Sequence, residues 1–195
     1  MRRWYFVVLL CLLSSPGTAQ VFDQTPWFLS ANIGEQHSGI RKEDYVASNF
    51  SPLITIEGGK FFTPFFALRL GVKGVYYNFI SDNDKHYYGF LYGDVVLDIH
   101  NIFAYRDDRI WNTQVFIGGG VMYNRYPYIS TYLGKLEYPK GRIMPAIDIG
   151  FSNLFRISRH LQLGIDFAGI CGWALYQNDE DMIPSASLRA VYSFR

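Results

Sequence analysis

The residues best suited to chemistry in this chain are charged side chains at the polar positions of stretches in which apolar and polar residues alternate. They comprise five acids and three bases: Glu57, Asp94, Asp98, Asp148, Asp166, Arg69, Lys73 and Arg189. Successive side chains of a strand point to opposite faces, so each charge is expected to lie opposite its apolar neighbours. Paired acids can perform general acid–base catalysis, which requires an accessible cleft and a path for substrate. What these charges do therefore depends on whether their face is open or enclosed.

Two acidic segments and one glycine run are weaker candidates for binding. Residues 81–84 (Ser-Asp-Asn-Asp) and 178–181 (Asn-Asp-Glu-Asp) could hold divalent cations. The first lacks the glycine and the closing glutamate of an EF-hand loop, so solvated acidic loops are the favoured interpretation of both segments. The Gly118-Gly119-Gly120 run falls in the middle of a predicted strand. Glycine there permits close approach by a neighbouring aromatic residue, and we do not expect a phosphate site.

Eight alternating stretches are predicted to be the β-strands that position these residues. They cover about 27–34, 52–59, 66–78, 87–100, 111–124, 142–151, 161–173 and 185–194. In the third stretch, Leu68, Leu70 and Val72 alternate with charged or small residues. Strands of about nine residues or more are what a tilted membrane strand requires. No stretch keeps a 3.6-residue apolar period, so no substantial helix is predicted.

The first 19 residues have the features of a cleavable secretion signal. Two arginines precede about ten apolar residues that end at Leu13, and small residues follow up to Ala19. The apolar run is too short to span a bilayer as a helix, which takes about 20 residues. We expect residues 1–19 to be the signal peptide and residues 20–195 to form one barrel domain.

The composition after cleavage excludes several classes of function. Loss of Arg2 and Arg3 lowers Lys+Arg from 18 to 16 against 17 Asp+Glu, a net charge of about −1. There is no basic surplus to suggest a nucleic-acid partner. Only Cys171 remains, and a single cysteine in an apolar strand is expected to be a packing residue. No later segment has 18 consecutive apolar residues. A membrane location would therefore require a closed barrel, since only helices and barrels satisfy every backbone group in lipid.

The connections between the predicted strands alternate in character. Those at 35–50, 79–86, 125–141 and 174–183 are polar and two of them are long, whereas those at 60–65, 101–110 and 152–160 are mostly shorter. Exported barrels with periplasmic termini have short periplasmic turns and longer extracellular loops. An even number of strands therefore predicts that both termini lie in the periplasm.

Aromatic residues make up 18% of the chain and gather at the predicted strand ends. One set is expected at the periplasmic interface: Trp27, Phe61, Phe62, Phe65, Phe66, Trp111, Phe151, Tyr192 and Phe194. A second set is expected at the outer interface: Tyr76, Tyr77, Tyr87, Tyr88, Tyr123, Tyr126, Trp173 and Tyr176. Tyr and Trp favour such interfaces because one end of the side chain is apolar and the other is wet. A soluble calycin-like barrel is the alternative, but it would expose a face rich in Lys, Glu and Thr.

Several short pieces of the sequence point to one family. They are Ala19-Gln20 at the signal end, the stretch 118–121, residues 150–158 leading into 161–163, and the aromatic last strand. With these pieces the chain resembles the small eight-stranded outer-membrane β-barrels of the OmpA/OmpX type, and more closely their Bacteroidetes-type branch. The resemblance covers essentially all of 20–195 and implies an all-β fold, an eight-stranded antiparallel up-and-down transmembrane β-barrel. Such barrels usually end on the aromatic residue itself, whereas Arg195 follows Phe194 here.

A barrel of eight strands encloses a space that side chains just fill. An unpaired charge buried there costs several kcal/mol. The eight charged residues are therefore expected to form a lumen network of ion pairs and hydrogen bonds, as the resemblance to closed small barrels also implies. A narrow aqueous pore is the alternative.

The predicted function is that of a non-enzymatic integral outer-membrane protein with a structural or surface-interaction role. Such a role could be that of a subunit in an envelope assembly. We assign the interaction surface to the outer loops at Tyr126, Tyr128 and Tyr132, because exposed tyrosines favour protein contact. These tyrosines could equally extend the outer aromatic belt. The expected partners are outer-membrane lipids and lipopolysaccharide, the barrel-assembly machinery and a protein partner in the outer membrane, with no nucleic acid, cofactor or metal.

A lipid A-modifying enzyme is the remaining class. Enzymes of that class carry a His with a Ser or an Asp near the outer rim. The candidates here are His37-Ser38 and Asp84-Lys85-His86, both in predicted outer loops. Neither repeats a motif of those enzymes, so exposed loop histidines are the favoured interpretation.

Overall fold

The computed structural model describes residues 26–37, 50–78, 85–106, 109–124, 128–129, 136–137, 142–173 and 180–194. Most of these residues form long strands, and the remainder include one short helix and a small hairpin. The long strands are β1 (Trp27–His37), β2 (Phe50–Phe61), β3 (Phe66–Asn78), β4 (Lys85–Asp98), β5 (Trp111–Asn124), β8 (Arg142–Arg156), β9 (Leu161–Trp173) and β10 (Glu180–Phe194). The helix is α2 (Ile99–Phe103), and the hairpin consists of β6 (Tyr128–Ile129) and β7 (Leu136–Glu137).

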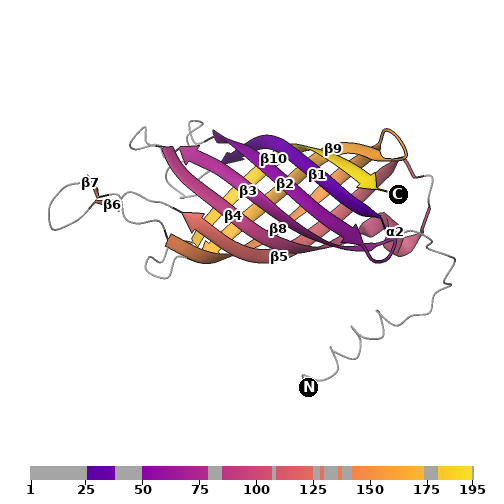
Figure 1. Ribbon diagram of the computed structural model, residues 1–195, viewed down its shortest axis with the longest axis horizontal. Coiled ribbons are helices and arrows are strands. Elements are labelled where there is room, and N and C mark those ends of the chain that lie inside the picture. Colours follow the sequence, from indigo (N-terminus) through magenta and orange to yellow (C-terminus); the bar gives the residue numbers. More distant parts are fainter. Residues whose placement is uncertain are drawn as a thin grey trace, which may run out of the picture.

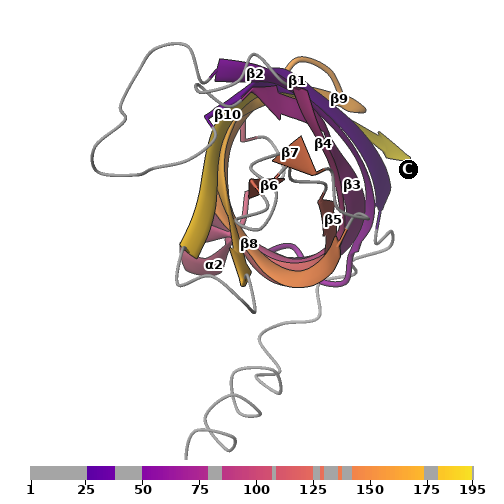
Figure 2. The same ribbon diagram turned by 90° about the vertical axis from the view of Figure 1, so that its left-hand side faces the viewer.

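The eight long strands form one closed antiparallel barrel. Each pairs with its neighbour along the chain, and β1 pairs with β10 from Trp27↔Phe194 to Gln36↔Ser185 to close the ring. Figure 2 looks along the barrel and shows this ring of strands. The predicted eight-stranded antiparallel up-and-down barrel is confirmed, and its strands are at least 11 residues long.

The two ends of the barrel differ. One carries α2, the turns at 62–65 and 157–160, the start of β1 and the end of β10, and we call it the α2 end (Figure 1). The other end, where β1 ends and β2 begins, we call the loop end. The β6–β7 hairpin lies beyond the loop end, and its two strands pair only with each other among the described residues.

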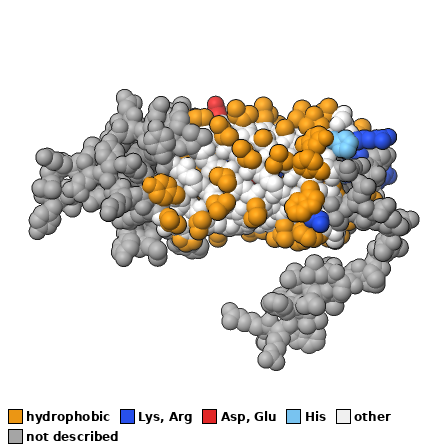
Figure 3. Space-filling model, viewed as in Figure 1, with side chains coloured by type: hydrophobic (Ala, Val, Ile, Leu, Met, Phe, Trp, Pro, Cys, Tyr) orange, Lys and Arg blue, Asp and Glu red, His pale blue; other side chains and the backbone are white. Residues whose placement is uncertain are grey.

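Alternation along each strand sends apolar side chains outward and polar or aromatic ones inward, as the sequence predicts. Many of the large outward side chains are about half exposed or more, among them Ile33, Leu70, Leu91, Ile117, Ile143 and Leu188. Figure 3 shows hydrophobic atoms spread along the barrel wall. The wall thus presents an apolar exterior around an interior that holds the buried polar and charged side chains, which is the arrangement of a membrane barrel.

The strands run further than the apolar pattern predicts, and one segment predicted as strand is helical. Residues 99 and 100 begin α2 because the side chain of Asp98 caps the helix, accepting from the backbone N of Asn101 at 3.0 Å and from its Nδ2 at 3.1 Å. None of the helices in the described part of the chain is long and apolar enough to cross a membrane.

The interior is layered along the barrel axis. The buried cluster nearer the α2 end consists of Phe28, Ala67, Val96, Phe116, Leu154 and Val191. The cluster nearer the loop end consists of Tyr88, Phe90, Tyr92, Met122, Met144, Ala146, Ile170 and Ile183. On β4 the inward order is Val96, Asp94, Tyr92, so charged side chains lie between the two clusters.

Two aromatic residues predicted for the interfaces point inward instead. Tyr88 is only 5% exposed and donates a hydrogen bond to Gln36 inside the barrel. Phe61 packs against the buried Phe28, with ring centroids 5.4 Å apart. Of the other predicted outer aromatics, Tyr123 is exposed. The side chains at 76, 77, 87, 126, 173 and 176 lie outside what the structure describes.

Candidate functional site

The interior charges converge on Glu57 of β2, which is 2% exposed. Its carboxylate accepts from the Ser30 hydroxyl at 2.7 Å and from the Tyr92 hydroxyl at 2.6 Å. The guanidinium of Arg69 lies 3.2 Å away, and that of Arg189 lies 2.8 Å away. Glu57 therefore forms ion pairs with two cations and accepts hydrogen bonds from two hydroxyl groups, and these four partners come from four other strands.

Arg69 links Glu57 to a second acid. Its Nε and Nη2 both approach Oδ2 of Asp94, at 2.8 Å and 2.7 Å. The guanidinium also lies over the ring of Phe116, 4.0 Å from the centroid. Hydrogen bonding on the guanidinium edge and stacking on its face together fix this side chain, a combination that lysine could not provide.

Arg189 makes the matching link on the other side. Its Nη1 donates to the Ser152 hydroxyl at 2.9 Å and lies 3.4 Å from Asp166. Asp166 also accepts from Asn32 Nδ2 at 2.9 Å. The network thus runs from β8 and β9 through β10, β1, β2 and β3 to β4. We call Glu57, Arg69, Asp94, Asp166 and Arg189, with these polar partners, the Glu57 network.

Lys73 and Asp148 form a separate pair, with Nζ 2.7 Å from Oδ1. The ammonium group lies 4.7 Å from the ring centroid of Tyr92 and 5.8 Å from that of Phe90. The pair therefore borders the Glu57 network through Tyr92 and faces the loop-end cluster.

The strand register explains how bulky ion pairs fit in so narrow a barrel. Glu57 is paired across the sheet with Ser30 on one side and Gly71 on the other, and Asp94 is paired with Gly118. A Cβ at Gly71 would lie 2.6 Å from the Tyr92 ring, so glycine makes room for the tyrosine that donates to Glu57.

The glycine run on β5 works differently from the prediction. A Cβ at Gly118 would lie 2.2 Å from Asp94 Oδ1, and one at Gly120 would lie 1.9 Å from the backbone O of Leu91. A carboxylate and a backbone segment, rather than an aromatic ring, therefore occupy the space that these two glycines leave.

Among the described side chains, acids outnumber bases in the interior ion pairs. Four acids, Glu57, Asp94, Asp148 and Asp166, face three bases, Arg69, Lys73 and Arg189. Within the described residues, Asp94 Oδ1 and Asp148 Oδ2 have no hydrogen-bond partner. Both acids are paired across the sheet with Gly118 from opposite sides.

Asp98 was predicted as a member of the lumen network, and the structure places it elsewhere. It is 2% exposed, but it lies at the α2 end and caps α2. Its position in β4 puts Asp98 on the inward face, as predicted, but the helix α2 takes up its hydrogen bonds.

Four uncharged residues of the Glu57 network were not assigned a role from the sequence: Ser30, Asn32, Tyr92 and Ser152. Each occupies an inward position in its strand. That parity, shared with the charged residues, is the signal in the sequence that could have identified them.

The predicted loop candidates are only partly described. His37 ends β1, with its ring 5.2 Å from that of Phe50. Lys85 and His86 begin β4 and Tyr128 begins β6, with side chains outside what the structure describes. The following also lie outside the described residues: Ser38, Asp84, Tyr126, Tyr132 and the segments 81–84 and 178–179. Among the described side chains, no group of three or more His, Cys, Asp or Glu residues is placed to hold a metal ion.

Comparison with known proteins identifies the fold. No protein-family model matches the chain, and no curated protein sequence matches it. Among solved structures, Neisserial surface protein A (NspA) aligns with a TM-score of 0.60 at 8% identity, over 86% of this chain and 97% of that one. Ail, the attachment invasion locus protein of Yersinia pestis, aligns with a TM-score of 0.56 at 11% identity, over 88% and 99%.

A third structure agrees with these two. The N-terminal β-barrel domain of Pseudomonas aeruginosa OprF aligns with a TM-score of 0.51 at 12% identity, over 88% of this chain and 100% of that one. These proteins are small eight-stranded outer-membrane β-barrels. The chain therefore has the fold of that class, and at such low identity the likeness extends to the fold alone.

Proposed function

We propose that this protein is a non-enzymatic, integral outer-membrane β-barrel with a structural or surface-interaction role, which acts through its loop end. The observation that carries the proposal is the Glu57 network, which joins strands across the barrel interior with members that are at most 5% exposed. Buried, mutually paired charges suit a closed scaffold, whereas catalysis needs a group that substrate can reach.

The exterior supports the membrane location. Ile33, Leu70, Ile143 and Leu188 are each at least 65% exposed on the outward face. Apolar side chains presented this widely favour contact with lipid acyl chains over water. Outer-membrane lipids, with lipopolysaccharide at the loop end, are therefore the proposed surroundings of the barrel.

We propose that the α2 end and both termini face the periplasm. The turns at 62–65 and 157–160 are short, whereas 38–49 and 125–141 are long connections at the loop end. In this proposal residues 1–19 are a secretion signal, 20–195 form the barrel domain, and the barrel-assembly machinery inserts it. The stretch 150–158 and the aromatic last strand support a place in the Bacteroidetes-type branch of these barrels.

The loop end is the proposed surface for a protein partner in the envelope. Loops on a rigid scaffold are where binding usually resides. The hairpin β6–β7 and the tyrosines at 126, 128 and 132 belong to one such connection. Attachment is the role that the name of Ail gives for that protein, and a surface-interaction role here would be of the same kind.

Three measurements on the protein in its membrane separate the classes of function. We expect a pull-down from native membranes to recover a partner, single-channel recording to show no regular conductance, and mass spectrometry of lipid A to show no change after overexpression. Stepwise conductance would assign a pore instead. A lipid A modification lost on replacing His37 or His86 would assign an enzyme.

A further inference from the structure

Exposed cations gather at the α2 end in the part of the chain whose side chains the structure describes. Among side chains that the structure describes, every exposed or partly exposed lysine and arginine lies at the α2 end: Lys60, Arg106, Arg109, Arg156 and Arg159. We call these five residues the basic rim. The acids with described side chains outside the Glu57 network and the Lys73–Asp148 pair are Asp98, buried as the cap of α2, and Glu35, exposed towards the loop end. Figure 3 shows the Lys and Arg atoms gathered at the α2 end.

Lys60 shows how the basic rim meets the apolar wall. It occupies an outward position of β2, paired across the sheet with Trp27. Its Nζ lies 5.3 Å from the ring centroid of Trp27 and 5.8 Å from that of Phe62, and both rings are about half exposed or more. A lysine at the edge of a lipid-facing surface lays its aliphatic stem on that surface and extends its ammonium group to the polar layer.

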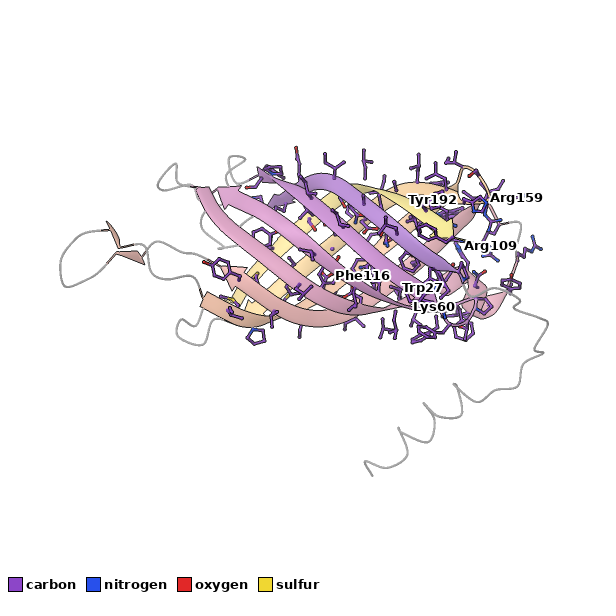
Figure 4. The ribbon with its side chains drawn as sticks, viewed as in Figure 1. Trp27, Lys60, Arg109, Phe116, Arg159 and Tyr192 are labelled. Carbon is purple, nitrogen blue, oxygen red and sulfur yellow. The ribbon has the colours of Figure 1, made fainter. Side chains whose placement is uncertain are left out.

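The turn at 157–160 repeats this combination on another part of the circumference. Arg159 and His160 are exposed, and the His160 ring stacks on that of Tyr192 with centroids 5.9 Å apart. His160 Nδ1 lies 3.0 Å from the backbone O of Ser193, which fixes the ring against the end of β10. Figure 4 shows Trp27, Lys60, Arg109, Arg159 and Tyr192 together at the α2 end.

The segment that follows β4 adds exposed apolar groups beside cations. Phe103 is 84% exposed and Ile110 is 70% exposed. Arg106 and Arg109 lie between them in the chain and flank Asp107 and Asp108. Arg109 Nη2 donates to the backbone O of Ala104 at 2.6 Å. Apolar side chains next to arginines are typical of segments that lie in the headgroup region of a membrane.

We propose that the basic rim binds the phosphate groups of anionic phospholipids in the leaflet that surrounds the α2 end. This inference rests on the proposed membrane function, because it needs acyl chains against the outward apolar wall. The position of the cations indicates a lipid as the ligand. They border an aromatic belt, and the apolar wall adjoins the other side of that belt. Charge complementarity selects anionic headgroups over zwitterionic ones, because a cation near an anionic membrane surface strengthens binding about fivefold.

The test is native mass spectrometry of the full-chain protein purified from membranes, with lipid bound from detergent micelles. The probes are phosphatidylglycerol, phosphatidylcholine and lipid A. Wild type should retain phosphatidylglycerol in preference to the other two. The double variant Lys60→Gln/Arg159→Gln should lose about 25-fold of its affinity for phosphatidylglycerol, about fivefold for each cation removed. The matched control, Arg142→Gln, removes a cation from the first residue of β8 at the loop end and should bind as wild type does.

Each other outcome contradicts the inference in a distinguishable way. Equal retention of phosphatidylglycerol and phosphatidylcholine, or a double variant that behaves as wild type, would overturn it. Rim-dependent retention of lipid A above phosphatidylglycerol would assign the rim to lipid A. Migration of unheated samples in gels reports whether each variant forms a barrel. If wild type itself forms no barrel in lipid, the proposed function fails, and this inference fails with it.

Discussion

Arg189 of β10 and Glu57 of β2 form an ion pair, Nη2 to Oε2 2.8 Å, although β1 lies between their strands. The hydroxyl of Ser30 on β1 donates to the same Oε2 at 2.7 Å. The same hydroxyl accepts a hydrogen bond from Arg189 Nη2 at 3.3 Å. Because Ser30 is small, the side chains of Arg189 and Glu57 can meet across β1. Because the β1–β10 pairing closes the barrel, this ion pair ties the closing seam from inside.

Replacing Arg189 with Leu should destabilise the barrel by about 3–5 kcal/mol, because it leaves Glu57 and Asp166 buried with one cation fewer. Urea unfolding from lipid vesicles measures the loss. Arg189→Lys, which keeps the charge and loses the second guanidinium nitrogen, should lose less. A loss under about 1 kcal/mol for Arg189→Leu would show that the seam does not depend on this residue.

The pair Lys73–Asp148 should behave as a coupled unit. Lys73→Met strands a fully buried carboxylate, and Asp148→Asn strands the ammonium group that it binds at 2.7 Å. The double variant has neither charge, so its loss should be smaller than the sum of the single losses by about 0.5–3 kcal/mol. A double-mutant cycle of unfolding free energies measures this coupling. Additive losses would mean that the two residues do not interact.

Gly71→Ala should destabilise the barrel by about 1–3 kcal/mol. The new Cβ would lie 2.6 Å from Tyr92, which must then move away from the carboxylate of Glu57. Gly89→Ala is the matched control on the neighbouring strand, because a Cβ there meets no atom within 4 Å. That control should stay within about 0.5 kcal/mol of wild type. Equal effects at both glycines would contradict the role given to Gly71.

Deletion of 127–139 should leave folding and insertion intact, because β6 and β7 pair only with each other among the described strands. Any partner recovered by the wild-type protein in a pull-down should be lost. Migration of unheated protein on a gel checks folding, and single Tyr→Ala variants at 126, 128 and 132 show whether tyrosines carry the contact. A partner that binds the deletion variant normally would place the interaction elsewhere.

Strand number, strand faces and barrel class could be predicted from the sequence, because a period of two is a local property of the chain. The strand ends could not. At residues 35–37 and 180–184 the apolar alternation fades, while the backbone pairing continues between strands that are already aligned. The five-residue helix α2 was missed because it is too short to show a helical period, and its start depends on the cap made by Asp98.

The interior charges could also be predicted as a set, but their partners could not. Glu57 pairs with Arg69 and Arg189 because of the register of four strands and the space left by Ser30 and Gly71. Those are relationships between segments far apart in the sequence. Similarly, Tyr87 and Tyr88 are adjacent and cannot both point outward, and the register turns Tyr88 to the interior.

The central claim, that this chain forms a closed membrane barrel, is tested most directly by gel migration of the protein lacking residues 1–19 after refolding into phosphatidylcholine vesicles. The unheated sample is expected to migrate faster than the boiled one and to show sheet-dominated circular dichroism. If the faster band of Arg189→Leu disappears at a lower urea concentration than that of wild type, the stability of the barrel depends on its interior network. A soluble, monomeric protein in buffer without detergent or lipid, with a single gel position before and after boiling, would contradict the account.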